Sequence, residues 1–263
     1  MSRTEREGVT LYYEAVGSGQ TVVFVNPAGY GAWCWSWLVD ALAGPVETLV
    51  WDYRGTGRSD GPPGPYDVGT LAADLDAVLA DHGVDGVHLV GAGLGGMVAL
   101  EHAFRGARAE TLTLVGTTAD GARVNADALD ALAAPRDDAD ALRESLRGAF
   151  SAGVVADHPD AVDRIVEWRA EDDADAAGWD AQTAAMTNYD ASDRLYEMTR
   201  PTLVVHGRAD GVVPFDAGRA LADGLPRGSF QPVETGHLAA AADPGAVEDA
   251  LTGFLASEGV DGV

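Results

Sequence analysis

The chain is 263 residues long, and its 46% hydrophobic content is enough to build the core of one large domain. It carries 42 Asp and Glu against 17 basic residues, all of them arginine, which gives a formal net charge of -25. This negative charge repels the phosphates of nucleic acids and anionic membrane surfaces, so neither is expected as a partner. The acidic residues are spread along the chain, which predicts a solvated acidic surface and a halophilic source.

The N-terminal segment and the cysteine count predict a cytoplasmic protein. Residues 1–8 are charged and lack the apolar stretch of a signal peptide, and no later segment approaches the length of a membrane span. Cys34 is the only cysteine, so an internal disulfide is excluded. Its tryptophan neighbours are typical of a small buried hydrophobic residue rather than of a reactive thiol.

The first half of the chain alternates strand and helix patterns. Strands are predicted over residues 9–16, 21–25, 46–52 and 111–115, with another beginning at residue 87, and helices over residues 33–43 and 68–82. This alternation predicts an α/β fold, with a mostly parallel sheet and helices on both faces.

The pattern changes between residues 120 and 200, where the chain is rich in Ala and Asp and helical in character. Strands are again predicted over residues 202–206 and 229–233, and a closing helix over residues 246–255. We therefore predict a core domain of residues 1–119 and 201–263, with residues 120–200 inserted as a helical cap. The acidic run at residues 171–175 is interpreted as a solvated helix face, and no metal site is expected.

A glycine-rich turn around Gly93 is the most informative motif. The apolar run from residue 87 breaks at glycines and continues as a good helix former, which predicts a strand, a sharp turn and a helix. In the G-x-S-x-G pattern, glycines flank a strained nucleophile because strand and helix pack closely there. Here residues 91–95 read Gly-Ala-Gly-Leu-Gly, so Gly93 stands where serine is expected.

Residues 91–96 also match the G-x-G-x-x-G dinucleotide fingerprint. That fingerprint requires an Asp or Glu about 20 residues further on, at the end of the next strand, to bind the ribose. The next predicted strand ends instead in Gly116-Thr117-Thr118. The dinucleotide interpretation is therefore disfavoured, and no cofactor is expected.

Two further segments complete a pattern with the glycine turn. Asp210 follows the predicted strand at 202–206, and His237 follows the one at 229–233. Together with Gly93, these segments make the chain resemble the α/β-hydrolase superfamily over essentially its full length, where nucleophile, acid and histidine occur in that order. The resemblance implies an α/β-hydrolase fold, with Asp210 as the acid of the triad, His237 as the catalytic histidine and Gly93 at the nucleophile position without its side chain.

The loop after the strand at 21–25 occupies the place of the family's oxyanion loop. The resemblance implies that the N–H groups of Ala28 and Leu94 stabilise negative charge that develops on a substrate oxygen. The chain departs from the family's His-Gly pair by carrying Asn26 and Pro27, and Asn26 is expected to take part in binding. Residues 54–59 match a glycine-rich family loop and are interpreted as scaffold.

The other nucleophiles and histidines lack this context. No replacement hydroxyl or thiol is expected from the candidates Cys34, Ser36, Thr117 and Thr118. The remaining histidines are interpreted as structural, although His206, at the end of a predicted strand, could line the pocket.

These residues lead to hypotheses of two classes. The first is an enzyme acting on a small apolar ester-, lactone- or carbonyl-type substrate, in hydrolase or lyase fashion, through an Asp-His dyad and a backbone oxyanion hole. Ordinary covalent ester hydrolysis is excluded, because losing the serine nucleophile costs on the order of a millionfold in turnover. The second is a non-catalytic ligand-binding protein, or a serine hydrolase inactivated by a Ser-to-Gly change. The expected partner is in each case a small molecule.

Overall fold

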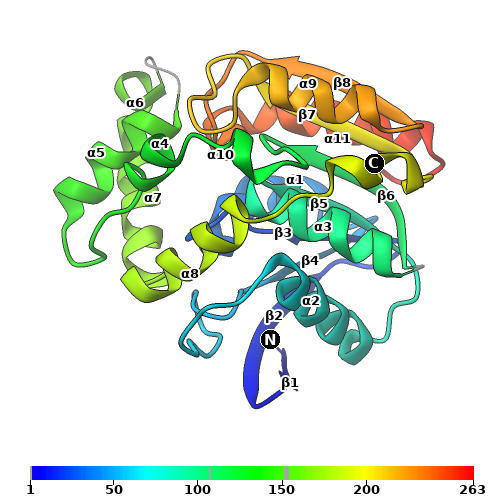
Figure 1. Cartoon of the computed structure of the whole chain (residues 1–263), viewed down its shortest axis with the longest axis horizontal. Coiled ribbons are helices and arrows are strands. Elements are labelled where there is room, and N and C mark those ends of the chain that lie inside the picture. Colours follow the sequence, from blue (N-terminus) through cyan, green and yellow to red (C-terminus); the bar gives the residue numbers. More distant parts are fainter. Residues whose placement is uncertain (1, 107, 151–153) are drawn as a thin grey trace.

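A computed structural model describes residues 2–106, 108–150 and 154–263, and these ranges contain one eight-stranded sheet (Figure 1). The strand order is β1-β2-β4-β3-β5-β6-β7-β8. The strand β2 is antiparallel to both of its neighbours, β1 and β4, and β3 to β8 are mutually parallel. The strands are β1 (Ser2–Arg6), β2 (Val9–Val16), β3 (Thr21–Val25), β4 (Glu47–Trp51), β5 (Val87–Ala92), β6 (Ala109–Val115), β7 (Thr202–Gly207) and β8 (Gly228–Val233). The predicted α/β-hydrolase fold, with a mostly parallel sheet, is confirmed.

Helices cover both faces of the sheet. The helices α2 (Val68–His82) and α3 (Leu94–Arg105) pack against each other, as do α1 (Ser36–Leu42) and α11 (Pro244–Ser257). The helix α9 (Phe215–Gly224) packs on β7 and β8. Every residue of β3 and β5 is buried, as expected of strands covered by helices on both sides.

Between β6 and β7 the chain leaves the sheet and forms the helices of the predicted insertion. These are α4 (Ala126–Asp130), α5 (Ala139–Ala149), α6 (Val154–Asp157), α7 (Pro159–Asp172) and α8 (Ala176–Thr187), with 3-10 turns at η2 (Gly121–Arg123) and η3 (Ser192–Glu197). In Figure 1, α4 to α7 gather in green on the left of the view, and α8 leads back toward the sheet. Residues 1, 107 and 151–153 of the predicted domain ranges lie outside the described residues.

The ends of α2 show why the sequence pattern located this helix so closely. Asp67 caps the N-terminus by accepting a hydrogen bond from the N–H of Thr70 at 2.7 Å. Gly83 ends the helix with a φ of 82°, in the left-handed region that glycine adopts most easily. Both end signals are local, so the observed bounds match the predicted range 68–82.

Three local expectations differ from the structure. The predicted helix at 33–43 is a 3-10 turn, η1 (Ala32–Trp35), followed by α1, and the side chains of Trp33, Cys34 and Trp35 in the turn are buried. The strand β1 was not predicted, because its charged residues show no apolar periodicity. The helix α9 was also missed. Within the described ranges, no helix is both long and apolar enough to cross a membrane.

The interpretation of the acidic run at residues 171–175 as a solvated face is wrong for Asp173. Its side chain is buried and forms an ion pair with the equally buried Arg169 at 2.7 Å. The same carboxylate accepts a hydrogen bond from the indole N–H of Trp33 at 2.8 Å. Burial raises the pKa of the Asp173 carboxyl, while the Arg169 guanidinium opposes the shift. The run therefore includes a buried anchor between the insertion and the core.

Candidate active site

Gly93 forms the sharp turn between β5 and α3, as the sequence predicted. Its backbone has φ 51° and ψ -117°, a conformation that residues with a side chain adopt only under strain. The flanking glycines are required by close packing. A Cβ on Gly91 would lie 2.3 Å from the carbonyl oxygen of Gly95, and one on Gly95 would lie 2.0 Å from that of Val25. The glycines therefore serve the turn between strand and helix.

The neighbouring strand β6 holds this turn in place. The N–H of Gly93 donates to the carbonyl of Val115 at 3.0 Å, and the hydroxyl of Thr117 donates to the carbonyl of Gly93 at 2.6 Å. Thr117 is fully buried, so its hydroxyl is committed to supporting the turn. The sequence offers Thr117 only as a substitute nucleophile and gives no signal for this structural contact.

Asp210 and His237 lie together at the ends of β7 and β8. The Nδ1 atom of His237 lies 3.1 Å from Oδ1 and 3.0 Å from Oδ2 of Asp210. Oδ1 also accepts the backbone N–H groups of Val212 and Val213, each at 2.9 Å, which orients the carboxylate. Because an ionised carboxylate only accepts hydrogen bonds, we assign the proton of the neutral imidazole to Nδ1, and the lone pair to Nε2.

The imidazole faces Gly93. A Cβ placed on Gly93 would lie 3.3 Å from Nε2 of His237, slightly closer than ordinary van der Waals contact. His237 is 3% exposed, and its Nε2 makes no hydrogen bond to any of the described residues. The fold therefore brings Gly93, Asp210 and His237 to one place at the carboxyl ends of neighbouring strands.

Gly116, which directly follows β6, packs on this pair and is not among the predicted site residues. It has φ 54°, and a Cβ there would lie 3.0 Å from the carbonyl oxygen of His237 and 3.2 Å from Oδ2 of Asp210. A glycine at the end of the strand next to the turn was the only sequence signal for it. Because Gly116 has no side chain, Asp210 and His237 can lie close to the end of β6.

His206 is a second buried imidazole beside Asp210. Its Nε2 lies 2.9 Å from the carbonyl oxygen of Val213 and 3.5 Å from Oδ2 of Asp210. Burial lowers the pKa of His206, which favours the neutral ring. The side chain is fully buried, in agreement with a structural role.

The loop after β3 carries the predicted oxyanion residues Asn26 and Ala28. The side-chain amide of Asn26 donates to the carbonyl of Trp51 at 3.0 Å and accepts the indole N–H of Trp35 at 3.1 Å. These bonds tie the loop to β4 and η1, so the contacts of Asn26 are those of an anchor rather than of a binding residue. The backbone N–H groups of Ala28 and of Leu94, the first residue of α3, have no hydrogen-bond partner among the described residues.

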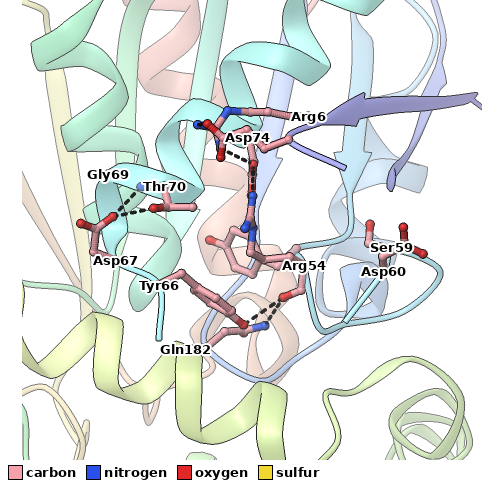
Figure 2. A network of polar contacts seen from close by, with 12 residues as sticks. Arg6, Arg54, Ser59, Asp60, Tyr66, Asp67, Gly69, Thr70, Asp74 and Gln182 are labelled. Carbon is pink, nitrogen blue, oxygen red and sulfur yellow. Dashed lines mark hydrogen bonds and ion pairs between the residues drawn. The ribbon is translucent and has the colours of Figure 1, made fainter. Parts of the chain in front are cut away.

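The loop after β4 contains Arg54, whose guanidinium is bound by Asp74 from α2. Figure 2 shows the pair, with Nε to Oδ2 at 2.6 Å and Nη2 to Oδ1 at 2.7 Å. Both side chains are buried, so this ion pair is a fixed part of the core beneath the site. The carbonyl of Arg54 accepts hydrogen bonds from Tyr66 and Gln182. These contacts agree with the scaffold interpretation of residues 54–59.

Hollows of different size adjoin the site and the insertion. A cavity of about 10 Å³ lies beside the site, lined by Pro27, Cys34, Trp35, Ala92 and residues 238–241. Burial raises the pKa of the Cys34 thiol well above its ordinary value, so this thiol stays protonated and unreactive. A larger hollow of about 440 Å³ lies in the insertion, lined by residues 133–137, 174–176, Trp179 and Asp180.

The described residues contain no group of three or more His, Cys, Asp or Glu side chains arranged to hold a metal ion. The chemistry that the geometry offers is proton transfer at Nε2 of His237. A base of this kind must have its ring held in one tautomer, which the Asp210 contact provides.

Comparison with known proteins places this geometry in context. Residues 22–250 match the sequence model of a family described as "Alpha/beta hydrolase family". A putative carbamate hydrolase, RutD, of Variovorax paradoxus is 30% identical, over 96% of this chain and 98% of its own length. The crystal structure of a hydrolase from Pseudomonas aeruginosa PA01 is similar with a TM-score of 0.85 and 26% identity, over 97% of each chain. Est816, an N-acyl homoserine lactone degrading enzyme, is similar with a TM-score of 0.84 and 28% identity, over 96% of this chain and all of its own.

Proposed function

Because the chain belongs to the alpha/beta hydrolase family, we propose that it binds a small, fairly apolar ester, lactone or carbamate and hydrolyses it without a serine nucleophile. The observation that carries the proposal is the His237 imidazole. Its Nδ1 is bound to Asp210, and its Nε2 lies 3.3 Å from the Cβ position of residue 93. The range of substrates is supported by the relatives, which include a putative carbamate hydrolase and a lactone-degrading enzyme.

Gly93 stands, in this proposal, at the position of the serine nucleophile. The backbone conformation of residue 93, and the 3.3 Å between its Cβ position and Nε2 of His237, both support this assignment. A serine side chain there would place its hydroxyl within reach of Nε2, which is the arrangement that a nucleophile and its base require. Without that hydroxyl, no acyl-enzyme can form, and water is the remaining nucleophile.

The proposed reaction is a general-base hydrolysis. Nε2 of His237 accepts a proton from water as the water oxygen bonds to the carbonyl carbon, and Asp210 stabilises the resulting imidazolium. The carbonyl oxygen becomes an oxyanion held by the N–H groups of Ala28 and Leu94. When the intermediate collapses, the bond to the leaving alcohol or amine breaks, and the imidazolium returns the proton to that group. One water is consumed, and an acid and an alcohol or amine are released; a carbamic acid, the product from a carbamate, then loses carbon dioxide.

Residues 1–119 and 201–263 form the core domain of this proposal, and residues 120–200 form a helical cap over the site. The support for the cap is the contact of α8 and the residues before it with the loop that carries Ala28. The hollow of about 440 Å³ in the insertion adjoins this contact through Trp179. A substrate would enter between the cap and the core.

A second function, ligand binding without catalysis, is favoured by one specific observation. Gly93 has no side chain at the position that Nε2 of His237 faces, so the site lacks the group that a serine hydrolase uses for attack. In this alternative the chain is a degenerate hydrolase that retains the pocket and has lost the reaction.

The test compares three proteins with p-nitrophenyl acetate, a small lactone and an aryl carbamate as probes: the natural chain, His237→Ala and Gly93→Ser. We expect the natural chain to hydrolyse at least one probe slowly, and His237→Ala to lose that activity. Gly93→Ser should raise kcat by at least about 10³-fold, because the nucleophile contributes most of the rate in serine hydrolases. His158→Ala, which changes an exposed histidine at the start of α7, is the matched control.

The outcomes separate the two functions. Turnover by the natural chain that depends on His237 supports the enzyme. Turnover by Gly93→Ser alone supports the degenerate hydrolase. If His237→Ala and the natural chain hydrolyse the same probe equally well, the general-base mechanism is wrong.

A further inference from the structure

Gln182 of α8 reaches from the insertion to the loop that carries Ala28. Its side chain is fully buried, although glutamine is usually exposed. Its Oε1 atom accepts the backbone N–H of Gly29 at 2.7 Å. Its Nε2 atom donates to the carbonyl of Arg54 at 3.2 Å, as Figure 2 shows. A buried polar group of this kind holds its partners in place, because leaving them unpaired would be costly.

The two partners fix the orientation of the amide. Gly29 offers a donor and Arg54 offers an acceptor, so only one of the two flipped positions of the Gln182 amide satisfies both. The carbonyl of Arg54 is itself anchored, because the guanidinium of the same residue is bound at two points by Asp74 and Tyr66 donates to the same oxygen. Gln182 therefore connects the loop to a rigid part of the core.

Gly29 is held by the insertion on three sides. Its carbonyl accepts the N–H of Ala174 at 2.8 Å, and its N–H is held by Gln182. A Cβ on Gly29 would lie 1.9 Å from the ring of Trp179, which is three residues before Gln182 on the same helix. With φ 77°, Gly29 also has a backbone conformation that favours glycine. Gly29, the residue after Ala28, is thus held by α8 and by the segment before this helix.

We infer that Gln182 is a positioning residue that sets the direction of the Ala28 N–H toward the reacting oxygen. The inference rests on the proposed function, because it assigns Gln182 to the oxyanion hole of that site. Asn26 fixes the start of the loop to the core, and Gln182 fixes its other end from the insertion. Ala28 lies between these two anchors, so releasing one of them lets the N–H turn away. A donor displaced by about 1 Å loses on the order of 10²-fold in rate.

The first measurement follows the loop without any reaction. Gln182→Met keeps the length and the apolar stem of the side chain but removes both hydrogen bonds. In the otherwise natural chain, we expect hydrogen exchange at the Gly29 amide, followed by NMR, to accelerate about five- to tenfold. The amides of β5 should not change. Thr183→Val is the matched control, because the Thr183 hydroxyl bonds only to carbonyls of its own helix.

The second measurement follows the chemistry in the Gly93→Ser background with p-nitrophenyl acetate. Gln182→Met should lower kcat by about 10- to 100-fold and leave KM within about threefold, because the lost interaction acts on the oxyanion. Gln182→Glu keeps an acceptor for the N–H of Gly29. When its carboxyl gains a proton at lower pH, it can also donate to the carbonyl of Arg54. Its kcat, divided by that of Gly93→Ser alone at the same pH, should therefore rise as the pH falls. Thr183→Val should change neither parameter.

Each outcome decides the inference. Unchanged exchange at Gly29, or a change in KM with kcat intact, overturns it. If neither the natural chain nor Gly93→Ser hydrolyses any probe, the proposed function is wrong. In that case, the effect of Gln182→Met on exchange at the Gly29 amide, measured without the Gly93→Ser change, decides by itself whether Gln182 holds the loop.

Discussion

The two halves of the site are built by different parts of the chain. The first half, with Gly93, Asp210 and His237, sits at the carboxyl ends of β5, β7 and β8, and its support comes from strand ends such as Gly116. The second half is the loop after β3, whose residues from Gly29 onward are held by the insertion.

The two halves also differ in what fixes them. Backbone pairing within the sheet sets the first half, since parallel strands bring their carboxyl ends to one edge. Side chains set the second half: Gln182 binds the N–H of Gly29, and Asp173 binds that of Gly31 at 3.3 Å. The insertion also contacts the first half, where the N–H of Leu238 donates to the carbonyl of Ala149 at 3.1 Å. A change confined to Gln182 or Asp173 would therefore disturb the loop beside Ala28 without touching these contacts. This difference suggests that the two halves can be perturbed separately.

The largest expected effect comes from removing Asp173, the main anchor of the second half. Asp173→Ala leaves the buried guanidinium of Arg169 without its carboxylate and frees the N–H groups of Gly31 and Trp33. Loss of one partner of a buried ion pair costs about 3–5 kcal/mol. We expect a loss of that size in the free energy of unfolding, measured by urea denaturation.

The control for this variant is Asp175→Asn, which keeps an N-cap acceptor for α8 and should change stability by less than about 0.5 kcal/mol. A loss below about 1 kcal/mol for Asp173→Ala would contradict the claim that this carboxylate anchors the insertion.

The second prediction concerns Asp52, which follows β4 at the border between core and insertion. Burial raises the pKa of Asp52 from 3.8 to about 6, and repulsion from Asp172 adds to the shift. Because the folded protein retains the proton between these two values, its stability falls as the pH rises through this range. At neutral pH the charged, 5% exposed carboxylate therefore costs about 2–3 kcal/mol.

Asp52→Asn removes this charge and retains an oxygen to accept the N–H of Arg58. We expect the variant to be more stable than the natural chain, with a gain about 2 kcal/mol greater near about pH 7.5 than near about pH 4.5. Urea unfolding at both pH values measures the difference. Asp85→Asn, at a fully exposed residue, is the control. An equal gain at both pH values would show that the carboxyl of Asp52 is not perturbed.

The third prediction concerns Gly116→Ala in the first half. The new Cβ would strain a backbone with φ 54° and press on the carbonyl of His237 and on Asp210, at a cost of about 1–3 kcal/mol. In the Gly93→Ser background we expect kcat to fall by about tenfold or more, because the imidazole is displaced. Exchange at Gly29 should stay unchanged, which distinguishes this variant from those of the second half.

Gly253→Ala provides the control for Gly116→Ala. It lies in α11 with no atom within 4 Å of the added Cβ, and it should stabilise the helix by up to about 1 kcal/mol. Faster exchange at the Gly29 amide in the Gly116→Ala variant would mean that the two halves are coupled. The claim that they can be perturbed separately would then be wrong.

Local sequence signals were enough to predict the first half. The range of α2 follows from Asp67 and Gly83 at its ends, and the turn at Gly93 follows from its flanking glycines. The resemblance to the α/β-hydrolase superfamily assigned Asp210 and His237, which follow two successive predicted strands, to the same site. Such signals work because helix caps, tight turns and strand periodicity depend on residues close together in the chain.

The second half could not be predicted in the same way. Asp173 in an acidic run and Gln182 in an Ala-rich helix have the sequence appearance of solvated residues, and Asn26 was expected to bind substrate. Each is buried and bonded to residues distant in sequence, as in the contact of Gln182 with Gly29, which are 153 positions apart.

By itself, the sequence determined the fold class, the turn at Gly93, and the strand ends that carry Asp210 and His237, because short-range patterns encode these features. Only the tertiary structure decided how the loop beside Ala28 is held. That depends on which polar side chains of the insertion become buried against the core, and burial is a property of the packed chain rather than of any single segment.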